Sequence, residues 1–259
     1  MSRHVITTFD RKYYERCGRA FVDTYRQFWP KTIPLTIYYE GDELEADEEN
    51  IKWRYMEEVE YLPQFLANIK PFAFMTGNVG GSYNIQYDAR MCRAGFIQAH
   101  HMRHGGKVLW LDADIITHGA VPETFIDDLL PDDKLCAYLA RDWWYSETGG
   151  LCMNADHPMA DAFRQLWVQV FNSGVIFSLP GWHDCYGFDI ARKSFGRPDL
   201  FMDLVAHLRH LRPSHPFVNS IFGAYMDHKK GPRKDGGRSS AKDLVVERSE
   251  PYWMNAGAS

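Results

Sequence analysis

The sequence predicts an α/β fold in which a mostly parallel central sheet is flanked by helices. The strand-like run at residues 4–9 is followed by a segment of helical character at residues 13–28, and a second strand-like run, LTIYYE, follows at residues 35–40. Strand, helix and strand in succession is typical of the start of an α/β sheet. Residues 108–111 are all apolar, which is typical of a central parallel strand buried on both faces.

The remaining elements are expected in the following order. Residues 53–69 are helical in parts, with a break near Pro63, residues 75–83 form a glycine-containing loop, and residues 83–104 form one helix. Residues 136–140 and 150–153 are strand candidates, and residues 157–171 form a helix with a proline near its first turn. We expect one main domain over residues 1–227 and a C-terminal segment over residues 228–259.

Composition indicates an ordinary globular protein. The chain has 259 residues, enough for one substantial core, and its net charge of −5 gives no overall attraction for nucleic acid. No apolar run approaches the length of about 20 residues that crosses a bilayer, and no secretory signal opens the chain, so we expect a cytoplasmic protein. Five scattered cysteines fit a reducing compartment. An acidic run at residues 40–49 and a basic run at residues 229–238 are the two charge clusters, and nothing in the sequence indicates an oligomeric state.

Two carboxylates directly follow the apolar strand at residues 108–111. Asp112 and Asp114 are two residues apart, so on an extended chain their side chains point the same way and can approach one cation. Ligands of open α/β sheets collect at the carboxyl ends of strands, and Mg²⁺ or Mn²⁺ takes oxygen ligands there. A turn or a helix cap is the plain alternative for Asp-x-Asp. A phosphatase motif is a weak rival, because Ile116 stands where its threonine would be.

The spacing His-x-x-Gly-x-x-Lys, formed by His228, Gly231 and Lys234, lies downstream of this Asp-x-Asp. The combination resembles the retaining family-8 glycosyltransferases of the glycogenin and bacterial galactosyltransferase type. The resemblance implies a GT-A domain, a nucleotide-sugar donor that usually carries uridine diphosphate, and a Mn²⁺ or Mg²⁺ ion. It implies that His228 is a third metal ligand beside Asp112 and Asp114, that Gly231 lets the backbone approach the diphosphate, and that Lys234 contacts its oxygens.

The motif departs from the family at its end, where Asp235-Gly236 replaces the usual Pro-Trp. An exposed basic loop is the plain alternative.

Three further fragments follow the order of that family. Arg90 is expected to contact the donor, Gly149 and Gly150 to lie beside its sugar, and Glu147 and Asp184 to act at the reacting centre. Thr7 and Phe9 of the first strand, together with Asp112, complete the expected donor site. The plain alternatives are an ion pair for Arg90, a surface charge for Glu147 and a helix cap for Asp184. Three tryptophans, Trp143, Trp144 and Trp182, suit either sugar stacking or core packing.

The sequence therefore predicts a metal-dependent glycosyltransferase that moves a hexose or pentose to an acceptor hydroxyl, with retention at the anomeric carbon. The overall pattern also looks like small glycosyltransferases of bacterial viruses, which suggests a hydroxymethylated base in phage DNA as acceptor. A surface or lipid-linked glycan is the alternative acceptor. A sugar-phosphate nucleotidyltransferase would need a glycine-rich loop where residues 7–16 read TTFDRKYYER. A non-catalytic sugar- or nucleic-acid-binding module would not need the three metal ligands.

Overall fold

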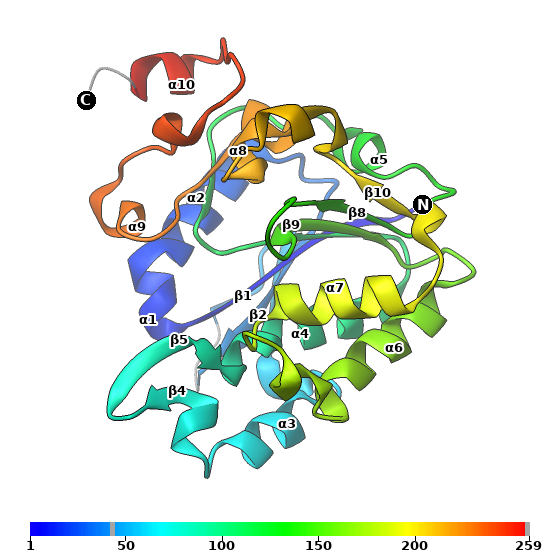
Figure 1. Ribbon diagram of the computed structural model, residues 1–259. Coiled ribbons are helices and arrows are strands. Elements are labelled where there is room, and N and C mark those ends of the chain that lie inside the picture. The colour runs from blue at the N-terminus through cyan, green and yellow to red at the C-terminus, as the bar shows by residue number, and fades with distance from the viewer. Residues whose placement is uncertain (42–44, 257–259) are drawn as a thin grey trace.

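The computed structural model describes residues 1–41 and 45–256, and its centre is a seven-stranded sheet in the order β10-β8-β9-β6-β1-β2-β3 (Figure 1). The strands are β1 (Arg3–Asp10), β2 (Leu35–Glu40), β3 (Ile51–Tyr55), β6 (Lys107–Leu111), β8 (Cys136–Leu139), β9 (Glu147–Asn154) and β10 (Phe201–Asp203). Strands β3, β2, β1 and β6 are parallel neighbours, β10 pairs in parallel with β8, and β9 runs antiparallel between β6 and β8. The mostly parallel sheet predicted from the sequence is confirmed.

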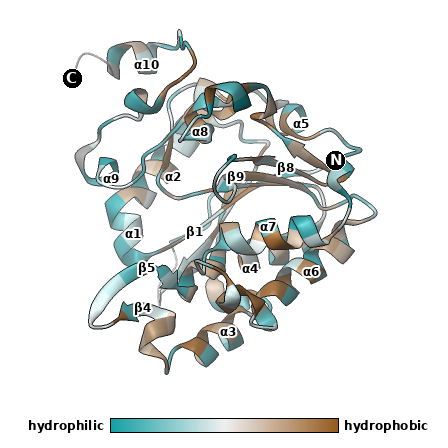
Figure 2. Cartoon of the chain, viewed as in Figure 1, coloured by the Kyte–Doolittle hydropathy of each residue, from teal (hydrophilic) through white to brown (hydrophobic). Residues whose placement is uncertain are grey.

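Helices cover both faces of this sheet. The helices α3 (Leu62–Ile69), α4 (Arg93–His101), α6 (Ala160–Asn172) and α7 (Asp184–Ser194) lie on one side. The helices α2 (Arg19–Phe28), α5 (Phe125–Leu129) and α8 (Pro216–Asn219) lie on the other. Strand β6 shows why both faces are covered: its side chains alternate, with Trp110 packed in the first core and Leu109 in the second. Figure 2 shows the hydrophobic character along β8 and β9.

The helix expected over residues 83–104 is wrong in its first half. Residues 82–88 form strand β5 (Ser82–Asp88), which pairs with β4 (Thr76–Val79) in an antiparallel hairpin, and α4 begins only at Arg93. The turn contains Gly80 and Gly81, both with positive φ (61° and 83°), the backbone that a tight hairpin requires. Tyr83, Ile85 and Tyr87 alternate along this strand, so the period of two was the better signal.

A third parallel strand was also missing from the sequence prediction. Residues 51–55 form β3, and Pro63 stands in the first turn of α3 instead of breaking a helix. The other expected elements are present with shifted ends: the first helical segment contains the short α1 (Arg11–Tyr13), a π-helical stretch and α2. Residues 42–44 of the acidic run at 40–49 lie outside the described residues.

The C-terminal segment is fastened to the rest of the chain at several points. Strand β11 (Met226–His228) pairs with β7 (Ile115–Thr117), so the boundary expected between residues 227 and 228 falls inside a strand. Helix α9 (Arg233–Gly236) and helix α10 (Pro251–Ala256) follow. In α10, Trp253 is buried and its Nε1 donates a hydrogen bond to the carbonyl of Gly223 (2.6 Å).

Across the described residues, every helix is too short or too polar to traverse a lipid bilayer.

Candidate active site

The parallel strands of the sheet place their carboxyl ends along one edge, and the start of the antiparallel β9 lies at the same edge. Leu111, the last residue of β6, pairs with Gly150 near the start of β9. The chain then turns sharply: the amide of Asp112 donates to the carbonyl of Gly149 (3.0 Å), and the amide of Ile115 donates to the carbonyl of Asp112 (3.1 Å). This turn places both acids of the Asp-x-Asp at the edge. Asp114 is buried, whereas 38% of the Asp112 side chain is exposed.

His228 reaches these acids because β11 pairs with β7. The register sets His228 opposite Ile115, the residue that follows Asp114. Its Nε2 lies 3.1 Å from Asp114 Oδ1 and 3.6 Å from Asp112 Oδ2. Ser240 holds the backbone in place, since its hydroxyl donates to the carbonyl of His228 (3.0 Å). Two carboxylates and one imidazole therefore converge as a set of oxygen and nitrogen donors that suits a divalent cation.

The ammonium group of Lys234 lies beside these acids. Its Nζ lies 2.6 Å from Asp114 Oδ2 and also donates to the hydroxyl of Tyr13, a residue of α1. Gly231 precedes it with φ of 60°, a left-handed backbone that opens the turn leading to α9. Burial alone raises the pKa of Asp114, but His228 and Lys234 hold that pKa below its usual value. Asp114 is thus an anion that positive groups already surround.

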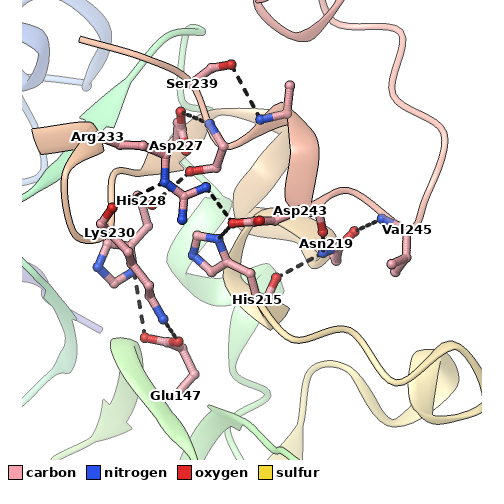
Figure 3. A network of polar contacts seen from close by, with 12 residues as sticks. Glu147, His215, Asn219, Asp227, His228, Lys230, Arg233, Ser239, Asp243 and Val245 are labelled. Carbon is pink, nitrogen blue, oxygen red and sulfur yellow. Dashed lines mark hydrogen bonds and ion pairs between the residues drawn. The ribbon is translucent and has the colours of Figure 1, made fainter. Parts of the chain in front are cut away.

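Glu147 lies on the far side of the same imidazole. Its Oε1 is 3.7 Å from His228 Nδ1, and its Oε2 accepts a hydrogen bond from Lys230 (Figure 3). Arg141 donates a further hydrogen bond to the same Oε2. Burial favours the neutral acid, but Lys230 and Arg141 hold the pKa of Glu147 well below its ordinary value. The carboxylate is buried, ionised and fully engaged, which leaves it little capacity to take a proton from a substrate.

The two glycines of β9 make room for neighbouring rings. A Cβ on Gly149 would lie 2.4 Å from Cε1 of His228, so the imidazole rests directly on the glycine backbone. A Cβ on Gly150 would lie 2.9 Å from a ring atom of Phe217. Gly149 thus helps to seat a candidate metal ligand, and Gly150 serves core packing.

Asp184 begins helix α7 and comes close to the Asp-x-Asp. Asp184 is the first residue of the helix, whereas the N-cap position belongs to His183, and neither side chain caps the helix with a hydrogen bond. Burial first, and then the negative charge of Asp112, raise the pKa of Asp184 to about 7. The structure therefore brings Asp184 to the same edge as Asp112.

Three expected donor contacts have other surroundings. Arg90 forms a two-pronged pair with Asp88 (2.8 and 2.7 Å) and remains 46% exposed. It lies in a 3₁₀ turn before α4 instead of on the expected helix. Thr7 is buried. Phe9 is buried too, against the rings of Tyr14 and Trp53, and the donor contact expected of Thr7 and Phe9 stays a prediction.

Sequence reasoning did not identify several residues that this edge contains: Arg141, Lys230, Tyr13, Thr148 and His215. Lys230 stood within the basic run, but nothing linked it to a carboxylate 83 positions earlier in the chain. His215 lies beside His228, with ring centroids 5.5 Å apart, and its Nδ1 is 3.0 Å from Asp243 (Figure 3).

Glu147, His215 and His228 form a second group of neighbouring side chains whose atoms could bind a metal ion. Two cations already neutralise Glu147, and burial and Lys230 lower the pKa of His215 to about 3. This second group is therefore a charge-compensated support, in contrast to the acids around His228 Nε2.

No protein-family model and no curated protein matches this sequence. The fold is similar to that of the bifunctional glycosyltransferase WbbM, with a TM-score of 0.53, 14% identity and coverage of 99% of this chain and 51% of that chain. It is also similar to the glycosyltransferase GlyE of Streptococcus pneumoniae TIGR4, with a TM-score of 0.50, 14% identity and coverage of 100% and 61%. Mouse xyloside xylosyltransferase 1 aligns with a TM-score of 0.47, 13% identity and coverage of 86% and 94%.

This chain thus spans about half of WbbM and 61% of GlyE. At such low sequence identities the likeness concerns the fold. The α/β GT-A domain expected from the sequence is confirmed: this chain shares its fold with solved glycosyltransferases.

Proposed function

We propose that this protein is a metal-dependent glycosyltransferase that moves a sugar from a nucleoside diphosphate to an acceptor hydroxyl. The observation that carries the proposal is the convergence of Asp112, Asp114 and His228 at the carboxyl edge of the sheet, with the ammonium of Lys234 on Asp114. Ligand sites of open α/β sheets lie at this edge. The fold shared with glycosyltransferases agrees with this chemistry without specifying donor or acceptor.

Asp112, Asp114 and His228 would hold the Mn²⁺ or Mg²⁺ ion. The donor set fits, because it offers two carboxylates and an imidazole nitrogen, and a cationic group already lies at Asp114. When bound, the ion would neutralise charge on the departing diphosphate. Glu147 would orient His228 from its other ring nitrogen, in place of the catalytic role that we expected from the sequence.

Lys234 would exchange its bond with Asp114 for an oxygen of the donor diphosphate. Its side chain is 18% exposed, and it follows the left-handed turn at Gly231, where a Cβ would meet only open space. An ammonium at this point stabilises the negative charge that develops on the leaving group. Arg90 is the second candidate for the donor phosphates or nucleotide, since part of its side chain is exposed. Uridine diphosphate, the usual carrier in the family that the sequence resembles, is the nucleotide we propose.

The reaction that we propose retains configuration at the anomeric carbon. The bond from that carbon to the diphosphate oxygen breaks, the acceptor oxygen bonds to the same face, and its proton passes to the released phosphate oxygen. Asp184 would stabilise positive charge on the sugar or orient the acceptor hydroxyl, because it lies near Asp112 and Thr148. With Glu147 engaged by two cations, Asp184 is the better placed of the two expected catalytic carboxylates.

The basic stretch that suggested a DNA acceptor has internal partners. Lys230 binds Glu147, Lys234 binds Asp114, and Arg233 Nη1 lies 2.5 Å from Asp243. These three cations of the basic run compensate acids of the fold and the site, which weakens the argument from charge for contact with a DNA backbone. The structure also gives no room to a nucleotidyltransferase loop, because β1 ends at Asp10 and helix α1 begins at Arg11.

The proposal is tested by binding and turnover together. Wild-type protein is expected to be thermally stabilised by uridine diphosphate only with Mn²⁺, and to hydrolyse at least one of UDP-glucose, UDP-galactose, UDP-N-acetylglucosamine and UDP-xylose slowly. In Asp112→Asn, both the Mn²⁺-dependent shift and the hydrolysis should be lost. The matched control is Asp161→Asn, which removes an exposed carboxylate of α6 that pairs with Arg164. Unchanged donor hydrolysis in Asp112→Asn would refute the metal assignment.

A further inference from the structure

An uncharged and partly apolar hairpin projects beside the candidate active site. Between Lys70 and Asp88 no residue carries a charge, although 24% of the chain is charged. In this segment, which contains β4 and β5, Tyr83 is 64% exposed and Ile85 is 47% exposed. The two side chains share one face of β5, because they are two residues apart on a strand.

The ring of Tyr83 is fixed in spite of its exposure. Its hydroxyl donates a hydrogen bond to Asp88 Oδ2 (2.9 Å), and a Cβ on Gly77 would lie 2.6 Å from the ring, so the ring packs against the glycine backbone. Because Asp88 also pairs with Arg90, the anchor of this ring is shared with a candidate donor contact. An exposed ring held at both ends loses little conformational entropy when a ligand stacks on it.

A second pair of exposed rings lies in the segment between β8 and β9. Trp143 and Trp144 are each 53% exposed. The next residue, Tyr145, packs on Tyr186 of α7 with ring centroids 3.7 Å apart, and Trp144 lies 6.4 Å from the same ring. By contrast Trp182 is buried, so of the three tryptophans considered from the sequence it is the one that serves the core.

Both exposed segments contact the start of helix α7, where Asp184 lies. On the hairpin side, His183 Nε2 donates to the carbonyl of Ile85 (2.8 Å), and the amide of Trp182 donates to the carbonyl of Gln86 (2.8 Å). On the tryptophan side, Tyr145 packs on Tyr186, two residues after Asp184 in the first turn of α7. Figure 1 shows the hairpin beside the chain that leads into α7.

The arginines near these rings are already paired, whereas the ammonium of Lys193 lies 5.9 Å from the centre of the Tyr145 ring. Arg90 is held by Asp88, Arg141 by Glu147, and Arg209 by Asp142 and Asp203. To contact any of these three arginines, a phosphate-rich acceptor would have to break its ion pair. Aromatic faces and uncharged amide side chains instead suit the C–H faces and hydroxyls of a neutral sugar.

We propose that Tyr83 and Ile85 on one side, and Trp143 and Trp144 on the other, form an acceptor platform that binds an uncharged saccharide next to Asp184. The assignment of the bound saccharide as the acceptor rests on the proposed function. The binding itself needs neither metal nor donor, so it can be measured separately.

The test is saturation-transfer NMR on the full chain with lactose, maltose, cellobiose and N,N′-diacetylchitobiose, without metal or nucleotide. At least one disaccharide is expected to show saturation of its ring protons in the wild type. Tyr83→Ala and Trp144→Ala should each weaken binding by about fivefold to tenfold, the loss of one stacking contact. Trp144→Phe keeps a ring and should retain most of the affinity. The control Tyr61→Ala removes another exposed ring, at the start of α3, and should change nothing.

Each other outcome argues against the platform. No response to any of the disaccharides, or equal binding in the Tyr83 and Trp144 variants, overturns it. If a short DNA duplex bound the wild type in a gel shift, and the same variants lost this binding, the ligand of these rings would be nucleic acid instead of a saccharide. If the wild type showed no Mn²⁺-dependent stabilisation by uridine diphosphate but still bound a disaccharide, the proposed function would be removed and the platform would remain.

Discussion

The two ring nitrogens of His228 face two groups of similar residues with opposite charge balance. On the Nε2 side, Asp112 and Asp114 carry two negative charges against the ammonium of Lys234. On the Nδ1 side, Glu147 carries one negative charge against Arg141 and Lys230. The same ligand types thus occur on both sides, but only the Nε2 side has an excess of negative charge that can accept a divalent cation.

The comparison shows that residue types alone do not define a metal site. The Nδ1 side also contains His215, whose ring is neutral because burial and Lys230 lower its pKa to about 3. A cation there would have to displace Arg141 and Lys230 from a buried carboxylate, whereas on the other side it has to displace only Lys234. The surrounding charges, which come from distant parts of the chain, decide between ligand and support.

The largest expected effect comes from removing the charge of the supporting carboxylate. Glu147→Gln leaves Arg141 and Lys230 without their anion, and breaking a buried pair by removing one partner costs about 3 kcal/mol of unfolding free energy. Loss of the support for His228 should also weaken Mn²⁺ binding by about 10-fold to 100-fold. Urea unfolding and Mn²⁺ titration by electron paramagnetic resonance measure the two effects.

A second substitution separates charge from packing in this variant. In Glu147→Gln combined with Lys230→Met, one unpaired cation is gone, so part of the lost stability should return while Mn²⁺ binding stays weak. If the double variant were instead less stable than Glu147→Gln, the unpaired charge of Lys230 would not be the source of the stability lost in Glu147→Gln.

A smaller effect is expected from crowding the imidazole without changing any charge. In Gly149→Ala, the new Cβ would lie 2.4 Å from His228 Cε1, so the ring must shift away from Asp114. Overpacking of this kind costs about 1–3 kcal/mol, and Mn²⁺ affinity should fall with it. Gly119→Ala is the matched control, because its nearest neighbour would be 3.6 Å away and its φ is not positive. Equal Mn²⁺ affinity in both variants would show that Gly149 does not seat the ligand.

The sequence predicted those parts of the site that local pattern controls. Asp112 and Asp114 follow an apolar strand, and a strand end of this kind leads to the carboxyl edge in any open α/β sheet. The motif from His228 to Lys234 was found through resemblance, and the structure places both residues against Asp114. Their roles in metal and donor binding stay predictions.

The sequence did not predict what depends on the order of strands. Arg141 and Lys230 meet at Glu147 only because β9 lies between β6 and β8 and because β11 pairs with β7. Such pairings join segments far apart in the chain, so no local period reveals them. The β4–β5 hairpin was missed for a different reason: the spacing of Tyr87, Met91 and Ala94 fits a helix, which was extended back to Tyr83, and the two positive-φ glycines were assigned to a loop.

The smallest expected effect concerns His101, which, unlike His228, has no carboxylate beside it. Burial lowers the pKa of His228, but Asp114 outweighs burial and raises it. His101 is buried among other histidines, and burial together with His4 and His104 lowers its pKa to about 3. The pKa of this ring is 6.5 in the unfolded chain and about 3 in the folded protein. At a pH between these two values, the unfolded state therefore binds up to one more proton at this ring than the folded state.

The sign follows directly: stability is lost as the pH falls from 6.5, by at most about 1.4 kcal/mol per pH unit for this one ring. His101→Gln removes the titrating group while its amide oxygen can still accept the hydrogen bond of the Tyr38 hydroxyl, which lies 2.9 Å from His101 Nδ1. Urea unfolding at neutral pH and at about pH 5 should therefore give a shallower pH dependence in the variant than in the wild type. Because His4 and His100, whose pKa values burial also lowers, titrate in both proteins, the difference between the two slopes isolates His101. Parallel slopes would mean that His101 takes up its proton in the folded state, and that burial without a carboxylate does not suffice to keep a ring neutral in this fold.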